Sequence, residues 1–187
     1  MGIPEILYED NHIIIVNKRS SDLVQGDGTG DESLDNIVRG YIKEKYGKPG
    51  DVFLGVVHRL DRPVSGCVVY ARTSKALTRL SELFRTRDVK KSYWAIVTDR
   101  PPAEEGSLHN YLKKNEQQNK SYVYDKEVKG SKSADLSYKI LARSERYYLL
   151  EIDLQTGSHH QIMAQLAAAG CPVRGDLKYG EKRSYEG

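Results

Sequence analysis

The stretch VVHRLDRPVSG, residues 56–66, places one acid, Asp61, between two arginines, Arg59 and Arg62. Two valines lead into it, and a Pro-Val-Ser-Gly segment leads out to the apolar run CVVYART, residues 67–73. The apolar run predicts a buried strand, and the turn residues before it predict a loop. The sequence therefore indicates a carboxylate in basic surroundings between two segments of the core.

Asp61 has the local chemistry of a nucleophile or a general base. The flanking arginines favour the ionised carboxylate, and partial burial between apolar segments removes water from it. A carboxylate that attacks directly needs neither a metal nor a neighbouring histidine. Taken alone, the Arg-Leu-Asp-Arg string is more typical of a structural ion-pair corner, so both interpretations stay open at this point.

Composition bounds the class of protein. The 187 residues, 39% of them hydrophobic, fit one domain with a sizeable core. A net charge of +3 permits an anionic partner without requiring one. No apolar run approaches the roughly 18 residues of a membrane span. We therefore expect a protein without a membrane segment.

The cysteine and tyrosine contents bear on the cellular compartment and on the protein surface. The two cysteines, Cys67 and Cys171, lie far apart, which favours a reducing, cytoplasmic setting and two small core residues. Thirteen tyrosines outnumber two phenylalanines and one tryptophan. Tyrosine suits a wet concave surface, but ordinary strand propensity explains the tyrosines equally well.

The pattern along the chain predicts an α+β fold, with mostly antiparallel strands and a few helices. Strands are expected in 6–18, around an Asp10-Asn11 turn, and in 67–73, 90–97 and, repeatedly, 108–153. Helices are expected from Ser33 to about Lys45, after a cap at Ser74, and over 159–169. In the last helix we expect Ile162 and Leu166 to face inward and Gly170 to form the C-terminal cap.

Five segments together resemble the RluA-type pseudouridine synthases. They are NK at 17–18, HRLDRPVSG at 58–66 followed by VVYARTSKAL, KKSYWAIV at 90–97, TGSHHQI at 156–162 and AAGCPVRGDLKYG at 168–180. The resemblance covers nearly the whole chain in the expected order. It implies a pseudouridine synthase fold, in which helices flank a mixed, mostly antiparallel central sheet. It also implies a single catalytic domain over 1–187 without the family's N-terminal RNA-binding module.

The resemblance implies isomerisation of uridine to pseudouridine in ribosomal or transfer RNA, by a monomer without cofactor or metal. The target nucleotide has to leave its stack to reach such a pocket. Asp61 matches the catalytic aspartate, and Tyr93 matches the tyrosine that stacks on the base and assists proton removal. Substrate or RNA contacts are expected at His58, Arg59, Arg62, Lys91, His160, Gln161 and Met163.

The third motif departs from the family pattern Gly-Arg-x-His-Gln-[Ile/Leu]-Arg, since residues 157–163 read GSHHQIM. In the family the second arginine pairs with the catalytic aspartate, whereas Met163 carries no charge. The alternative function is therefore a catalytically impaired RNA-binding protein of the same fold. A hydrolase that releases the base is a further alternative, although no second carboxylate lies near Asp61 in the sequence.

Three smaller expectations complete the sequence picture. His159 and His160 are not expected to bind a metal, because adjacent residues on a helix face different ways and no third ligand is evident. The chain stops soon after GDLKYG, so we expect it to lack the C-terminal strand region of the family. The lysines around Tyr122 and Tyr124 suit either RNA or a solvated sheet face.

Overall fold

The computed structural model describes residues 2–26, 28 and 30–180. The chain divides into two compact units, Met1–Val89 (unit 1) and Lys90–Gly187 (unit 2), and each is described here by itself. The expectation of one catalytic domain over 1–187 stays a prediction. Unit 1 contains β1 (Glu5–Glu9), β2 (Ile13–Lys18), α1 (Leu34–Lys45), β3 (Gly55–Val56), β4 (Gly66–Ala71) and α2 (Ser74–Thr86). Unit 2 contains β5 (Ser92–Val97), β6 (Glu105–Asn115), β7 (Lys120–Tyr124), β8 (Lys132–Arg143), β9 (Tyr148–Leu154) and α3 (Gln161–Ala168).

Unit 1 is built on an antiparallel sheet with the strand order β1-β2-β4-β3. The predicted turn between β1 and β2 is confirmed, since an Asp10 carboxylate oxygen accepts hydrogen bonds from the backbone N–H groups of His12 and Ile13. Strand β2 alternates half-buried and buried residues, which places Ile14 and Val16 in the core. Helix α1 covers this core with its apolar stripe, which includes Leu34, Val38 and Ile42.

The helices of unit 1 begin close to where the sequence predicts, but their caps differ. Ser33 precedes α1, yet its hydroxyl donates to a carboxylate oxygen of Asp35 and caps no backbone N–H group. The cap of α2 is Thr73 and not Ser74, because the Thr73 hydroxyl accepts a hydrogen bond from the backbone N–H of Ala76 at 3.1 Å. A hydroxyl one residue earlier has the extended backbone that a cap needs.

Helix α2 packs closely on β3 at Gly55. A Cβ atom at position 55 would lie 2.9 Å from two side-chain carbons of Leu77, so only glycine leaves room for this contact. The packing places α2 next to the loop that carries Asp61.

The two cysteines differ in their surroundings, so the expectation that both lie in the core is wrong for one of them. Cys67 is exposed on β4, because Val68 and Tyr70 occupy the core-facing positions of that strand. Cys171 is fully buried in unit 2, and burial raises the pKa of its thiol to about 11.

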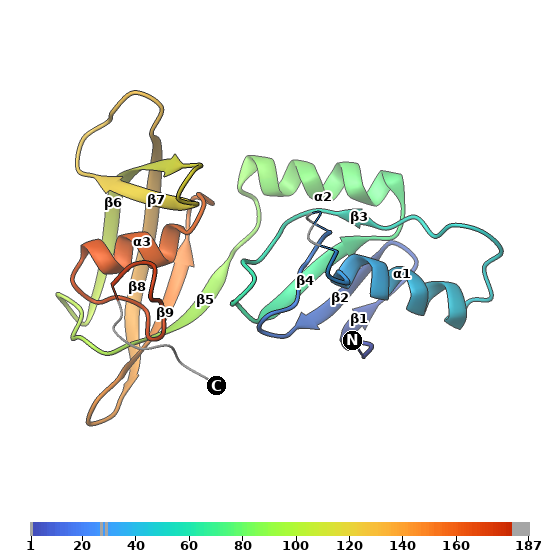
Figure 1. The fold of residues 1–187 in the computed structure, drawn as a ribbon, viewed down its shortest axis with the longest axis horizontal. Coiled ribbons are helices and arrows are strands. Elements are labelled where there is room, and N and C mark those ends of the chain that lie inside the picture. The colour runs from blue at the N-terminus through green and yellow to red at the C-terminus, as the bar shows by residue number, and fades with distance from the viewer. Residues whose placement is uncertain (1, 27, 29, 181–187) are drawn as a thin grey trace. The chain divides into compact units, whose positions relative to one another are not determined.

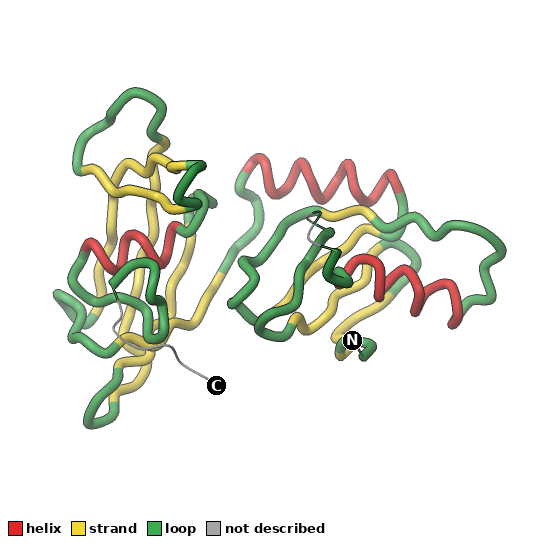
Figure 2. The backbone as a smooth tube through the Cα atoms, in the orientation of Figure 1, coloured by secondary structure: helices red, strands yellow, loops and turns green. Residues whose placement is uncertain are grey.

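Unit 2 contains an antiparallel sheet with the strand order β5-β9-β8-β6-β7. Its inner face carries buried apolar residues, among them Ala95, Leu136, Tyr138 and Ile152, which form a core with Leu166 of α3. Figure 1 shows α3 lying across this sheet, and Figure 2 shows the loops that connect the long strands. The other face of the sheet, here called the outer face, carries the alternate residues of each strand.

Helix α3 begins at Gln161, two residues later than the sequence predicts, because His160 adopts a left-handed backbone conformation with φ of 52°. Leu166 faces inward as predicted. Ile162 also faces inward as predicted, since it packs half-buried against the same core. The other buried residues of the helix are Ala164 and two glutamines, Gln161 and Gln165. Gly170 follows the helix with φ of 83°, the left-handed residue that commonly ends a helix.

The α+β prediction is confirmed. The strands form two antiparallel sheets, one in each unit, where the sequence suggested one central sheet. Among the residues described, no helix is both long and apolar enough to cross a bilayer.

Glu9 forms a cluster of charged and aromatic groups at the end of β1. Its carboxylate accepts hydrogen bonds from Lys45 at 2.7 Å, Arg72 at 3.0 Å, Tyr46 at 2.8 Å and Tyr41 at 3.1 Å, while its side chain is only 8% exposed. Burial acts to raise the pKa of Glu9, but the hydrogen bonds from Lys45 and the two tyrosines outweigh burial, so the pKa lies below its usual 4.5. The ionised carboxylate therefore joins β1, α1 and the end of β4.

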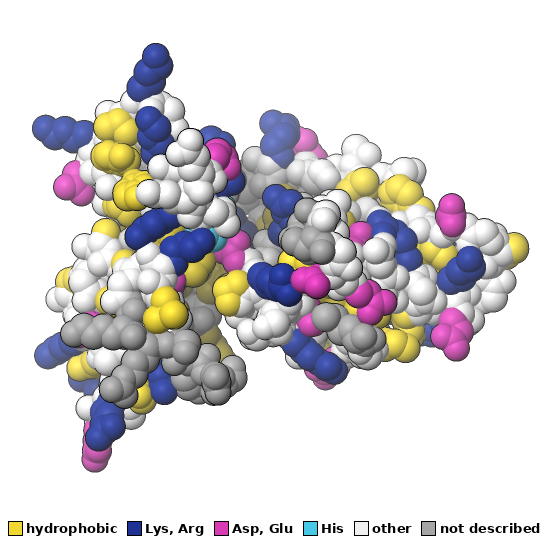
Figure 3. Space-filling view, in the orientation of Figure 1, with side chains coloured by type: hydrophobic (Ala, Val, Ile, Leu, Met, Phe, Trp, Pro, Cys, Tyr) yellow, Lys and Arg dark blue, Asp and Glu magenta, His cyan; other side chains and the backbone are white. Residues whose placement is uncertain are grey.

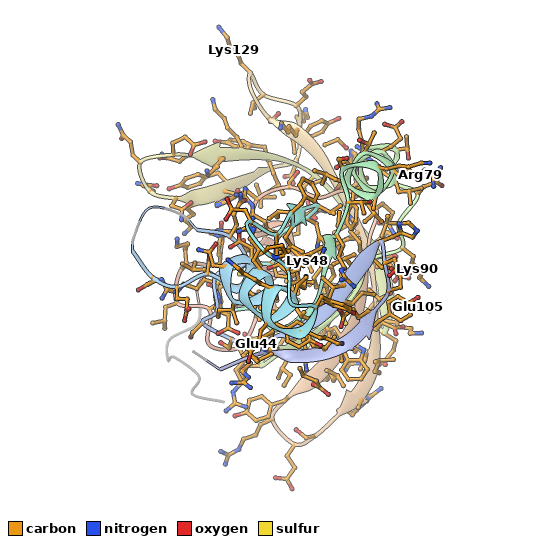
Figure 4. The ribbon with its side chains drawn as sticks, turned by 90° about the vertical axis from the view of Figure 1, so that its right-hand side faces the viewer. Glu44, Lys48, Arg79, Lys90, Glu105 and Lys129 are labelled. Atoms are coloured by element: carbon orange, nitrogen blue, oxygen red, sulfur yellow. The ribbon has the colours of Figure 1, made fainter. Side chains whose placement is uncertain are left out.

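Glu9→Gln is expected to lower the free energy of unfolding by about 2 kcal/mol at pH 7, because it removes the charge from hydrogen bonds to two cations. A carboxylate whose pKa is depressed by folding stabilises the protein above its unfolded pKa, and this contribution disappears as pH falls through the folded pKa. Denaturant unfolding at several pH values should therefore show the variant and the native chain converging in acid. Glu44→Gln, at an exposed position on α1 labelled in Figure 4, is the matched control and should change little. A gap between Glu9→Gln and the native chain that persists in acid would contradict the assignment.

Candidate active site

Asp61 lies in the loop between β3 and β4, residues 57–65, which is called the aspartate loop below. A turn closed by a hydrogen bond from the Val64 N–H to the Asp61 carbonyl gives the loop its shape. The Asp61 residue is half-buried, and its side chain makes no hydrogen bond or ion pair within the described part of the chain. The carboxylate is thus held by its backbone and is available to a substrate.

Lys18 holds the aspartate loop by hydrogen bonds from the protein interior. Its side chain is completely buried, and its ammonium group donates to the carbonyls of Arg19 at 3.1 Å, Arg62 at 3.0 Å and Val64 at 2.5 Å. Two of these carbonyls belong to the aspartate loop and one to the segment after β2. A buried ammonium group needs such partners, because an unpaired charge in the interior is very costly.

The charge of Lys18 also acts on the loop. Burial lowers the pKa of Lys18, and the negative charges of Asp22 and Asp61 oppose this effect. Lys18 is therefore a cation that interacts electrostatically with the Asp61 carboxylate. Sequence reasoning used Lys18 only as part of a family signature, although the alternation of β2 places it on the buried face with Ile14 and Val16.

The segment after β2 holds the aspartate loop from the other side. The Ser21 N–H donates to the Arg62 carbonyl at 2.9 Å, and the Ser20 hydroxyl donates to the Pro63 carbonyl at 3.0 Å. Ser21 has a left-handed backbone with φ of 74°. Together with Lys18, these bonds fix the backbone on both sides of Arg62.

The two arginines that flank Asp61 have different surroundings. Arg59 is exposed and has no hydrogen bond or ion pair among the residues that the structure describes. Arg62 pairs with Asp31 at 2.9 Å, and both side chains are about half exposed. Because an exposed pair of this kind contributes at most about 1 kcal/mol, Arg62 can exchange Asp31 for another anion at little cost.

His58 is anchored inside unit 1. Its Nε2 atom accepts a hydrogen bond from the Val69 N–H at 3.0 Å, and its ring stacks on Phe84 of α2 with the centroids 4.8 Å apart. These contacts tie the start of the aspartate loop to β4 and α2. They suit a residue that positions the loop, and the predicted contact of His58 with RNA stays a prediction.

In unit 2, Tyr93 lies on the inner face of β5, half-buried against the core. It is aligned with Ile152 of β9. Lys91, two residues before it, donates from its ammonium group to the Thr156 carbonyl at 3.3 Å. A Cβ atom at position 157 would lie 3.3 Å from the Lys91 Nζ atom, so Gly157 gives this side chain its room.

The buried Gln161 side chain joins residues 155–158, the segment between β9 and α3, to β8 by hydrogen bonds. Its carbonyl oxygen accepts hydrogen bonds from the Thr156 hydroxyl at 2.8 Å and the Ser158 N–H at 3.0 Å. Its amide nitrogen donates to the Asp135 carbonyl at 3.1 Å. Both ends of the Gln161 amide are used inside the protein, which suits a residue that positions this segment, and the predicted contact of Gln161 with RNA stays a prediction.

His159 and His160 lie before α3 and not on it, so the reasoning that they face different ways is wrong. Their rings stack with the centroids 3.7 Å apart. His159 contacts the Ser121 hydroxyl and the Asn119 side chain, while His160 contacts the Tyr179 hydroxyl at 3.0 Å. Among the described residues, no group of three or more His, Cys, Asp or Glu side chains is arranged to hold a metal ion.

The predicted site residues thus fall into two groups. Unit 1 carries His58, Arg59, Asp61 and Arg62 on the aspartate loop. Unit 2 carries Tyr93 and Lys91 on or beside β5, with His160, Gln161 and Met163 at the start of α3. Met163 is half-buried. The sequence interpretation missed the buried Lys18, whose ammonium group holds the backbone of the aspartate loop.

Lys18→Met is expected to lower the free energy of unfolding by about 3 kcal/mol, since it removes three hydrogen bonds that a fully buried ammonium group donates. Hydrogen exchange at the amides of Ser21 and Val64, which bond within and beside the aspartate loop, should accelerate. Lys43→Met, the same substitution at an exposed position of α1, should stay within about 0.5 kcal/mol of the native chain. Equal effects of the two substitutions would show that Lys18 does not secure the loop.

Comparisons with a family model and with individual proteins all identify the same family. The family described as RNA pseudouridylate synthase matches residues 12–168. The "tRNA pseudouridine synthase C" of Vibrio cholerae is 31% identical over 95% of this chain and 74% of its own length. The "Ribosomal large subunit pseudouridine synthase C" of Buchnera aphidicola is 34% identical over 94% of this chain, but over only 54% of its own length.

The fold agrees with these sequence relationships. The solved structure of human RNA Pseudouridylate Synthase Domain Containing 4 superposes with a TM-score of 0.84, at 24% identity, over 98% of this chain and 73% of the human chain. The chain spans a little over half the length of the first curated relatives it matches. On the match over residues 12–168, the chain belongs to the RNA pseudouridylate synthase family.

Proposed function

We propose that this protein isomerises uridine to pseudouridine in RNA, with Asp61 as the nucleophile. The observation that carries the proposal is the half-buried Asp61 carboxylate, presented by a loop whose backbone is bound by the buried Lys18 ammonium group. Membership of the RNA pseudouridylate synthase family supports it independently.

The reaction conserves all atoms and electrons. The bond between the ribose C1′ and the uracil N1 breaks, the base turns, and a bond forms between C1′ and C5. The hydrogen on C5 leaves as a proton, and the freed N1 takes up a proton. Asp61 attacks either C1′, which releases the uracil as an anion, or the uracil ring, and it departs when the new bond is complete. Because nothing is oxidised or reduced and the carboxylate supplies the nucleophile, the proposed reaction needs no cofactor and no metal.

Tyr93 is proposed to stack on the base and to assist removal of the C5 proton. Its half-buried position on the inner face of β5 supports this role, because the packed core behind the ring keeps it in place. A flipped base needs such an aromatic surface, since it has lost its stacking partners in the RNA.

The arginines of the aspartate loop are proposed to contact the RNA. Arg59 is exposed, and Arg62 is held only by an exposed ion pair, so both can reach phosphates. His58, Lys91, His160 and Gln161, whose polar atoms bond to other parts of the chain, are proposed to position these contacts. The names of the relatives support ribosomal or transfer RNA as the substrate class. The proposed protein is a monomer in the cytoplasm.

Lys18 is proposed to supply the positive charge that the family's arginine provides and Met163 does not. The electrostatic interaction between Lys18 and Asp61 supports this assignment.

Tritium release from RNA that carries 5-tritiated uridine tests the function, because isomerisation frees the hydrogen on C5. The native chain should release label, and Asp61→Asn should reduce the rate by about 10³-fold or more, since it removes the nucleophile. Asp51→Asn, at an exposed position before β3, is the matched control and should behave like the native chain.

Met163→Arg should also release label at a rate close to that of the native chain. Release by Met163→Arg alone would instead identify the native chain as an RNA-binding protein without isomerase activity. Free uracil among the products would identify a glycoside hydrolase. Either result would overturn the proposed function.

A further inference from the structure

We propose that the outer face of the β6–β7 hairpin binds a single-stranded segment of the substrate RNA by base stacking, a deepening that rests on the proposed function. The surface is formed by Tyr111, Lys113, Lys120, Tyr122 and Tyr124 and is called the tyrosine platform below. It lies on the face of the sheet opposite to α3 and to the candidate site residue Tyr93.

The register of the hairpin defines the platform. Tyr111 of β6 is aligned with Tyr124 of β7, and Lys113 of β6 is aligned with Tyr122 of β7. Aligned residues of antiparallel strands point to the same face, and so do residues two apart on one strand. The three tyrosines and Lys113 therefore share one face. The T-shaped contact between the rings of His109 and Tyr111, at 5.4 Å, fits this arrangement.

The burial of the neighbouring residues confirms that the three tyrosines lie on the outer face of the sheet. The intervening residues Leu112 and Val123 pack with Ala134 and Ala164 in the core between the sheet and α3. Tyr122 and Tyr124, by contrast, are 40% and 38% exposed. Two large aromatic rings thus stand next to each other on the solvent side of the sheet, about 7 Å apart along the strand, so each can take one base.

Cations surround the platform. From Tyr111 to Lys132 the chain has six lysines and three acidic residues, so this segment carries a net charge of +3. Lys120 lies over the Tyr122 ring, with its Nζ atom 5.9 Å from the ring centroid. Figure 4 shows Lys129 projecting from the loop between β7 and β8, and Figure 3 shows Lys and Arg side chains standing out around this end of unit 2.

The other half of the outer face has the opposite charge. An open depression there is lined by Glu105, Glu151 and Asp153, and its one lysine, Lys139, is paired with Glu151 at 2.7 Å. Trp94 on β5 is 73% exposed beside this acidic half, where it is aligned with Glu151. Phosphates are repelled by the acidic half and attracted to the lysines, which confines an RNA strand to the hairpin end.

Single-stranded RNA fits this surface better than a protein does. Proteins that bind single strands combine exposed aromatic rings with cations that follow the backbone. Lysine is depleted in interfaces between proteins, whereas here Lys113 is aligned with Tyr122 and Lys120 lies over its ring. A duplex keeps its bases stacked inside the helix and offers no free base faces to the rings.

Fluorescence anisotropy with a labelled single-stranded RNA of about 12 nucleotides tests the platform. The full chain carrying Asp61→Asn is used throughout, so that the RNA is not turned over. Adding Tyr122→Ala and Tyr124→Ala should weaken binding about tenfold per ring. Tyr122→Phe with Tyr124→Phe should bind within about threefold of the parent, because the rings remain. Trp94→Ala removes an exposed aromatic residue from the acidic half and should leave binding unchanged.

The salt dependence of binding tests the cations. Lys113→Gln and Lys129→Gln should each reduce the slope of log K against log salt by about 0.7, the value for one phosphate contact on a single strand. Lys139→Gln, on the acidic half of the same face, is the matched control and should not reduce the slope.

Equal binding by the Tyr→Ala pair and the parent would overturn the platform. An equal loss with the Tyr→Phe pair, or a loss of the same size for duplex RNA, would do the same. Displacement of the RNA by polyglutamate at equal charge would also overturn it, since the site would then bind any polyanion. Tritium release by the chain with Asp61 intact separates this test from that of the proposed function, because the platform variants change binding while release depends on Asp61.

Discussion

An ammonium group with no exposed surface has to be surrounded by oxygen atoms, and in this protein that requirement shapes the aspartate loop. Lys18 ends β2 at an inward-facing position, and its ammonium group draws in the carbonyls of Arg62 and Val64. The loop has no regular structure of its own, so these bonds fix where its backbone runs. The position of Asp61 therefore depends on a strand that lies more than forty residues earlier in the chain.

In unit 2 an uncharged side chain fixes the backbone of an irregular segment. The amide of Gln161 bonds to the 155–158 turn with its oxygen and to the Asp135 carbonyl with its nitrogen. In both units a buried polar side chain next to a regular element holds an irregular segment by its backbone. The side chains of Asp61, Arg59 and Met163 make no hydrogen bond to another described residue and remain available for other contacts. Lys18 and Gln161 thus hold the backbone, while other residues present side chains that are available for contacts.

Much of this arrangement could be predicted from the sequence, because the signals are local. Alternation and turn residues identified the strands of 6–18 and 108–153, and the motif around Asp61 identified the family. The roles of Lys18 and Gln161 could not be predicted in the same way, since a lysine at a strand end and a glutamine at a helix start are usually exposed. Their burial follows from the direction in which β2 and α3 present them to segments far away in the sequence. The shift of the second helix cap to Thr73 is a smaller case, in which two adjacent hydroxyl residues compete for one position.

The unequal burial of the two cysteines gives the chain a built-in chemical handle. Cys67 is exposed at the second residue of β4, directly after the aspartate loop, whereas Cys171 is fully buried and burial raises the pKa of its thiol to about 11. Only a thiolate reacts with alkylating reagents at an appreciable rate, so at neutral pH a maleimide dye modifies Cys67 and spares Cys171. A fluorophore can thus be attached beside the aspartate loop of the native sequence, without engineered cysteines, and its emission would report changes in the surroundings of that loop.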